Sequence, residues 1–209
     1  MPKRSYVSPL RAAAASETRE RVVEAAGRLL REEATIAGFS LEAVAKAAGV
    51  TRLTVYNQFG SRRGLLEAAF DERAREGGLG RLQDAMAMPD ADAALDRVIR
   101  IFCDFWSSDA AMGRLHDATA LDKEFADALK ARHERRRTLI KTLVDRIAAK
   151  TQAGRSECRD AVDLIFALTS YALFDMLRRD RSAQAISAIV TSACHAALAG
   201  LRPSESADR

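Results

Sequence analysis

Gly49 joins two short segments whose apolar residues have helical spacing, and the residues around it restrict how these segments can pack. Ala45 precedes it by four positions and Val55 follows it by six. A small residue lets two helices cross closely, and a glycine readily adopts the left-handed backbone of a tight turn. A branched apolar residue then packs the second helix against the first. The spacing therefore predicts a helix-turn-helix over residues 41–58.

The second helix of this motif, residues 51–58, has an inward and an outward face. At about 100° per residue, Val55 and Phe59 point inward. The outward side chains suit a DNA major groove, where Arg bonds guanine, Asn bonds adenine and an apolar group meets a thymine methyl. They are Arg52, Leu53, Thr54, Tyr56 and Asn57. The other interpretation of this face is a surface helix with one exposed leucine.

Helical periodicity continues along most of the chain, so the sequence predicts an all-α fold. Only 4 prolines and 11 glycines occur in 209 residues, which favours helices over strands and hairpins. We expect about nine helices, near residues 16–33, 41–48, 51–58, 61–76, 92–107, 110–117, 122–150, 157–179 and 182–199.

These segments group into a small head and a larger body. The head, residues 16–64, holds the helix-turn-helix, and the body covers residues 65–201. Residues 1–15 are predicted to be a flexible basic arm. Residues 202–209 lack an apolar anchor and are predicted to be a disordered tail.

The basic surplus of the chain lies in its first third. Residues 1–64 hold 11 Lys or Arg against 6 Asp or Glu, whereas residues 65–209 hold 22 against 23. A positive module joined to a neutral body is what a phosphate-binding head needs.

Several other classes of protein are disfavoured. No run reaches the roughly 18 to 20 apolar residues of a membrane span, and no signal-peptide core begins the chain. We therefore expect a cytoplasmic protein with no membrane partner. Cys103, Cys158 and Cys194 lie far apart, which suits reduced thiols. Catalytic and phosphate-loop motifs are absent and the three histidines are scattered, so we expect no enzyme, no cofactor and no metal site.

The segment TRERVVEAAGRLLREEATIAGFSLEAVAKAAGVTRLTVYNQFGSRRGLLEAAFDE resembles the DNA-binding head of the tetracycline-repressor (TetR) family. Its Gly-Phe-Ser entry, Ala-Gly-Val turn and Thr-x-x-Thr-Val-Tyr-x-x-Phe helix carry the resemblance, which covers about residues 17–72. Beyond these residues only the number and order of helices agree. The resemblance implies a double-stranded DNA operator as partner.

The resemblance also implies roles for individual residues of the head. Thr54 and Tyr56 would contact phosphates, and Arg62 stands where the family usually has a phosphate-binding lysine. Ser40 would anchor the first helix of the motif to the DNA backbone. Glu42 departs from the basic residue of some members and is left out of the site. The full DNA-binding set is Ser40, Thr51, Arg52, Leu53, Thr54, Tyr56, Asn57 and Arg62.

For the body, the resemblance implies a homodimer and a pocket for a small-molecule effector. The segment 157–179 is apolar nearly all round, which independently calls for more cover than one neighbour gives. The expected dimer interface is Phe166, Leu173, Ile186, Ile189, Val190, Ala193 and Ala197. The expected effector site, for an apolar or aromatic ligand, is Phe102, Phe105, Trp106, Met112, His116, Phe125, Tyr171 and Phe174. A plain core is the alternative for each of these residues.

The sequence thus predicts a ligand-responsive DNA-binding regulator, most often a repressor, that binds a palindromic operator. A constitutive or architectural DNA-binding protein without an effector is the alternative. Lys3, Arg4 and Arg11 could reach a minor groove, although a solvated arm is the simpler interpretation. Gly77 and Gly78 could form a joint between head and body, or an ordinary weak point in a helix.

Overall fold

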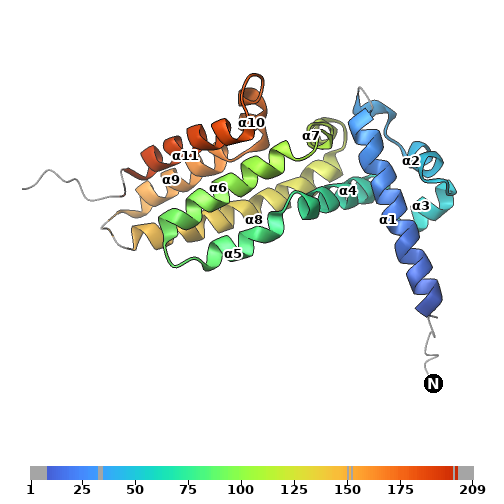
Figure 1. Cartoon of the computed structure of the whole chain (residues 1–209), viewed down its shortest axis with the longest axis horizontal. Coiled ribbons are helices and arrows are strands. Elements are labelled where there is room, and N and C mark those ends of the chain that lie inside the picture. The colour runs from blue at the N-terminus through green and yellow to red at the C-terminus, as the bar shows by residue number, and fades with distance from the viewer. Residues whose placement is uncertain (1–8, 33–34, 150, 152, 200, 202–209) are drawn as a thin grey trace, which may run out of the picture. The chain divides into compact units, whose positions relative to one another are not determined.

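The computed structural model describes residues 9–32, 35–149, 151, 153–199 and 201, and these residues form eleven α-helices and two short 3-10 helices without a strand (Figure 1). The all-α fold is therefore confirmed. Residues 1–8 of the expected arm and the expected tail, 202–209, lie outside the described residues.

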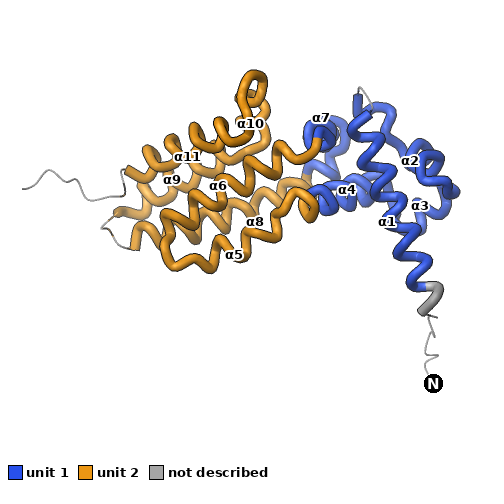
Figure 2. The backbone as a smooth tube through the Cα atoms, viewed as in Figure 1, with its two compact units in different colours: residues 1–73, 110–126 blue, residues 74–109, 127–209 orange. Residues whose placement is uncertain are grey.

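Two compact units divide the chain (Figure 2). Unit 1 comprises residues 1–73 and 110–126, and unit 2 comprises residues 74–109 and 127–209. The segment 110–126, which we assigned to the body, groups with the head. The division into a DNA-binding and an effector-binding domain at residues 64 and 65 stays a prediction.

Unit 1 is built on the long first helix, which packs against α2 and α7, while α2 packs against α3. Helix α1 begins at Pro9, earlier than the expected start at Ser16. Val22 and Ala26 of α1 are fully buried together with Val44 and Val55. The elements are α1 (Pro9–Glu32), η1 (Ile36–Gly38), α2 (Leu41–Ala48), α3 (Arg52–Phe59), most of α4 (Arg62–Glu76), α7 (Ala111–Leu121) and the first turn of α8 (Lys123–Ala148).

Unit 2 is organised around α6, whose broad apolar face packs against α5, α10 and α11. Helix α9 packs against α10 and α11. Beside the rest of α4 and α8, the elements are η2 (Leu79–Arg81), α5 (Leu82–Ala87), α6 (Ala91–Ser107), α9 (Arg155–Leu168), α10 (Tyr171–Leu177) and α11 (Ala183–Ala199). No helix among the described residues is long and apolar enough to cross a membrane.

The helix expected over residues 157–179 is broken, and this break together with α5 raises the count above nine. Ser170 starts α10, because its side chain accepts a hydrogen bond from the backbone N–H of Leu173. The carbonyl oxygen of Thr169 accepts from the indole of Trp106 at 3.0 Å and from the guanidinium of Arg136 at 2.8 Å. Side chains from two other helices therefore stabilise the break.

Candidate nucleic-acid interface

The turn of the helix-turn-helix has the geometry that its sequence predicts. Gly49 has φ 66° and ψ 35°, and its N–H caps α2 on the carbonyls of Ala45 and Lys46. Ser40 begins α2, because its hydroxyl accepts from the backbone N–H of Ala43 at 3.1 Å. Each end of α2 is thus closed by a residue suited to that position.

Helix α3 has the inward and outward faces that the sequence predicts. Val55 is fully buried and Phe59 is 9% exposed, whereas Leu53 and Tyr56 are 66% and 53% exposed. Arg52 and Asn57 are also exposed. The outer face of α3 therefore carries hydrogen-bonding groups together with exposed apolar surface, the kinds of group that major-groove and phosphate contacts use.

The two threonines of α3 have a structural role as well. The Thr51 hydroxyl accepts from the Thr54 backbone N–H at 3.1 Å, and the two hydroxyls lie 2.9 Å apart. Thr51 is exposed and Thr54 is half-buried. Their hydroxyls lie together at the start of α3, where the positive end of the helix dipole favours an anion.

Helix α1 fixes the far end of α3. The guanidinium of Arg19 lies 4.4 Å from the centre of the Phe59 ring and donates to the carbonyl of Gln58. The Gln58 amide in turn donates to the carbonyl of Ala15. The recognition helix is therefore held from the turn side by Gly49 and from its end by α1.

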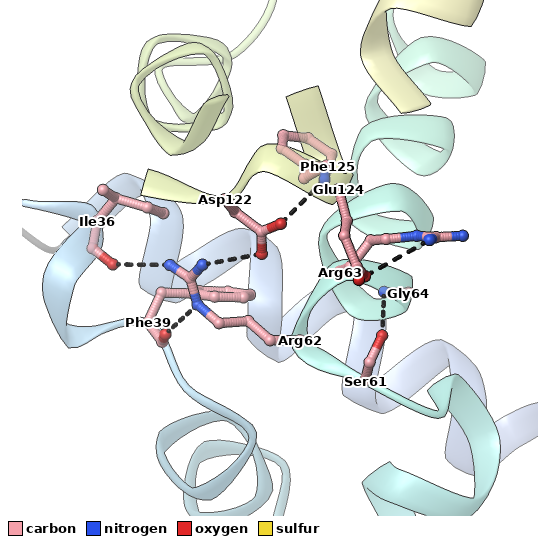
Figure 3. A network of polar contacts seen from close by, with 9 residues as sticks. All are labelled: Ile36, Phe39, Ser61, Arg62, Arg63, Gly64, Asp122, Glu124 and Phe125. Atoms are coloured by element: carbon pink, nitrogen blue, oxygen red, sulfur yellow. Dashed lines mark hydrogen bonds and ion pairs between the residues drawn. The ribbon is translucent and has the colours of Figure 1, made fainter. Parts of the chain in front are cut away.

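The next helix, α4, starts immediately beside α3. The Ser61 hydroxyl accepts from the N–H of Gly64 at 3.1 Å, so Ser61 caps the start of α4 (Figure 3). Gly60 has φ 71° and closes α3 on the carbonyl of Tyr56. A Cβ at position 64 would overlap the carbonyl oxygen of Phe59, so the close approach of α3 and α4 requires glycine there.

Arg62 does not lie free at this helix start. Its guanidinium donates to the carbonyl oxygens of Phe39 and Ile36, at 2.9 and 3.3 Å, and to Asp122 at 3.3 Å (Figure 3). Its neighbour Arg63 pairs with Glu67 at 2.7 Å, and this hydrogen bond raises the pKa of Arg63. Sequence reasoning missed Asp122, although an aspartate three positions before the first buried residue of a helix is a common N-cap signal.

The residues of the expected effector site fall into two groups. Phe102, Phe105, Trp106, Tyr171 and Phe174 are all buried in unit 2, where the Trp106 ring is 4.6 Å from Phe105 and 5.6 Å from Tyr171. Met112, His116 and Phe125 belong to unit 1, and His116 is exposed. The structure thus brings four of the eight residues, Phe102, Phe105, Trp106 and Tyr171, into one aromatic cluster around Trp106, and Phe174 is buried in the same unit.

Arg136 belongs to the same cluster and was not foreseen. It is only 6% exposed and lies over the Phe166 ring at 4.4 Å and the Phe102 ring at 5.7 Å. Burial lowers the pKa of Arg136 to about 10. In the sequence this residue stands among charged neighbours in the run KARHERRR, and nothing local distinguishes it from them.

The residues of the expected dimer interface differ in how far they are exposed. Ile186 and Val190 are buried within unit 2, whereas Ile189 is 42% exposed. Phe166, Leu173, Ala193 and Ala197 are half-buried. Two residues that we did not foresee, Leu164 on α9 and Met176 on α10, are 53% and 66% exposed. Apolar side chains therefore reach the surface on α9, α10 and α11.

Comparison with known proteins finds a family model that matches the head of the chain. Residues 22–69 match the family model for bacterial regulatory proteins of the tetR family. No curated protein matches the chain by sequence.

Solved structures match over nearly the whole length. A protein from Rhodococcus sp., assigned to the TetR-family transcriptional regulators, aligns with a TM-score of 0.72 and 19% identity, over 88% of this chain and 100% of that one. NalD from Pseudomonas aeruginosa, the secondary repressor of the MexAB-OprM multidrug efflux pump, aligns with a TM-score of 0.67 and 21% identity. This alignment covers 88% of this chain and 97% of NalD. The fatty acid degradation regulator FadR from Bacillus halodurans aligns with a TM-score of 0.67 and 18% identity, over 88% of this chain and 96% of that one.

An all-α fold with a capped helix-turn-helix is the architecture that this chain shares with the structures described as transcriptional regulators. The family model matches the head, and the solved structures share the fold over most of the chain. The chain is thus similar to the TetR family in the sequence of its head and in its fold.

Proposed function

We propose that the protein is a ligand-responsive repressor that binds a palindromic operator as a homodimer and leaves it when a small apolar or aromatic effector binds. The observation that carries this proposal is the outer face of α3, where Arg52, Leu53 and Asn57 are exposed on a helix anchored by buried Val55 and Phe59. These side chains supply the donors and apolar surface that major-groove readout uses. DNA as partner also makes the cytoplasm the expected place of action.

The homodimer is supported by the outer faces of the last three helices. Leu164, Met176 and Ile189 expose large apolar side chains there, and α11 adds small residues that permit close helix packing. Exposed apolar surface of this kind is typical of a protein interface. A twofold dimer would present two recognition helices about 34–36 Å apart, which predicts half-sites separated by one turn of DNA.

The effector is best matched to the aromatic cluster of unit 2. Trp106 is the single tryptophan of the chain, so its fluorescence reports on this cluster alone. A panel of apolar and aromatic compounds should include members that change this emission and, at the same concentrations, release the protein from its operator. Compounds that alter the emission without any effect on DNA binding would contradict the coupling.

Repression is the direction that the structural relatives support, since NalD is named a repressor. The alternative, an architectural DNA-binding protein without an effector, is separated by one binding experiment. Mutation of one half-site should reduce the affinity of a specific regulator sharply, because each mismatched base pair costs about 1–3 kcal/mol. Equal affinity for intact and mutated sites, with a steep salt dependence, would favour the architectural alternative.

A further inference from the structure

The donors of Arg62 are largely occupied inside unit 1. A guanidinium has five N–H groups on three nitrogens. In Arg62 each of the three nitrogens donates to a protein oxygen, on Phe39, Ile36 and Asp122. The side chain is 29% exposed and the Asp122 side chain is 16% exposed. A DNA phosphate at this position would have to compete with acceptors that are already in place.

Asp122 is itself held in a fixed position. One carboxylate oxygen accepts from the backbone N–H of Phe125 at 2.9 Å, at the start of α8, and the other accepts from Arg62 (Figure 3). Phe125 is fully buried. The carboxylate therefore has a defined geometry before Arg62 meets it, which favours a directed charge-assisted hydrogen bond.

The two carbonyls that Arg62 binds belong to the segment that leads into the helix-turn-helix. Ile36 opens η1, and Phe39 directly precedes Ser40, the N-cap of α2. Both side chains are buried, and Arg62 lies 5.9 Å from the centre of the Phe39 ring. Arg62 thus joins the entry of α2, the start of α4 and the start of α8.

We propose that Arg62 and Asp122 are a positioning pair that sets α2 and α3 in the arrangement that meets DNA, and that Arg62 does not grip a phosphate. This proposal rests on the proposed function, in which α3 reads the operator. Arg63 is the better candidate for a phosphate contact at this helix start, because its side chain is 47% exposed against 29% for Arg62, and its partners Glu67 and Glu124 are side chains that can move rather than backbone carbonyls.

The first test uses operator affinity in the full-length protein. Asp122→Asn keeps a side chain that can cap α8 but weakens the bond to Arg62. Charge alone predicts tighter DNA binding for this variant, since it removes a negative charge. The positioning pair predicts a loss of about tenfold, equivalent to about 1.4 kcal/mol. The control Glu124→Gln removes a nearby negative charge that is 74% exposed and pairs with Arg63 instead of Arg62, so this variant should not weaken binding.

The second test separates positioning from a phosphate grip. Arg62→Lys retains the charge that a phosphate needs but lacks the planar fork that reaches three acceptors. We expect Arg62→Lys and Arg62→Gln to lose affinity alike, with the salt dependence unchanged. Loss of a phosphate contact in Arg62→Gln would instead make the salt dependence shallower, because the negative slope of log K against log salt would shrink by about 0.9. A shallower salt dependence in Arg62→Gln, or full operator affinity in Arg62→Lys, would overturn the proposal.

A third readout needs no DNA and therefore separates this proposal from the proposed function. Amide hydrogen exchange in α2 should be faster in Asp122→Asn than in the wild type and in Glu124→Gln, while α6 and α11 keep their protection. Unchanged exchange in α2 would overturn the positioning pair even if the wild type binds DNA. Faster exchange in a protein that selects no DNA sequence would support the pair and contradict the proposed function.

Discussion

The indole N–H of Trp106 donates to the backbone carbonyl oxygen of Thr169 at 3.0 Å, across 63 residues of chain. This bond ties α6 to the break between α9 and α10, where Arg136 shares the same acceptor. Trp106, expected as a ligand contact with plain core as the alternative, therefore has a structural role. Any test of effector binding at Trp106 has to take this role into account.

Trp106→Phe should destabilise the protein. The variant loses one buried hydrogen bond, worth about 1 kcal/mol, and part of a buried ring. We expect the free energy of unfolding to fall by about 1–3 kcal/mol, measured by urea denaturation. The exposed Tyr56→Phe is the control and should leave the free energy of unfolding unchanged. An equally stable Trp106→Phe would mean that Arg136 alone is sufficient at the Thr169 carbonyl.

Gly64→Ala should disturb the junction of α3 and α4, because the added Cβ would overlap backbone at Phe59. Overpacking of this kind typically costs about 1–3 kcal/mol, and operator affinity should fall with stability. Gly80→Ala is the matched control, since a Cβ there meets nothing within 4 Å. Thermal unfolding of the two variants measures the difference. Equal melting temperatures would show that α4 can shift at no cost.

Burial raises the pKa of Cys103 to about 11 and that of Cys194 to about 12. A thiol in the unfolded chain titrates near 9.0. Between these values the unfolded state loses protons that the folded state keeps, so the free energy of unfolding should fall as pH rises above 9. Denaturation at pH 8 and pH 10 measures this. The double variant Cys103→Ala with Cys194→Ala should show a smaller fall in the free energy of unfolding between these two pH values. An equal fall in the variant and the wild type would contradict this role of the thiols.

Leu164→Glu and Ile189→Glu should each weaken the dimer, because a carboxylate would be buried at the proposed interface. Sedimentation at micromolar concentration should show monomers, and cooperative binding to a two-half-site operator should be lost. Leu121→Glu is the control, since Leu121 is 65% exposed but lies on α7 in unit 1. If both Leu164→Glu and Ile189→Glu remain dimers, the interface does not include these faces of α9 and α11.

Two neighbours on α3 should behave differently in DNA binding. Leu53→Ala should change the preferred base at one position of each half-site, because an apolar side chain reads a thymine methyl. Tyr56→Phe removes only a hydroxyl and should weaken binding to all sequences alike. Affinities for a set of single-base operator variants measure both effects. The reverse pattern would mean that α3 is rotated in the groove.

The parts of this site that depend on local periodicity could be predicted from the sequence. The caps at Ser40 and Thr51, the turn at Gly49 and the inward direction of Val55 all depend on residues a few positions apart. A helix-turn-helix is specified within one stretch of chain, and its signals are therefore visible without tertiary structure.

The surroundings of Arg62 could not be predicted in this way. Its acceptors at Phe39, Ile36 and Asp122 lie 23, 26 and 60 residues away. The break at Thr169 was missed partly for the same reason, since side chains from α6 and α8 bind the Thr169 carbonyl, and partly because the local N-cap at Ser170 was overlooked within an apolar run. Polar contacts between distant segments leave no periodic signal.

Selection of DNA bound by the full-length protein from a random pool tests the central claim most directly. A dimeric operator-binding regulator should enrich one palindrome whose half-sites are centred about one helical turn apart. Enrichment should disappear in a variant that carries Arg52→Ala with Asn57→Ala. Recovery of unrelated sequences held only by salt-sensitive affinity, or of the same palindrome with the α3 variant, would contradict the account.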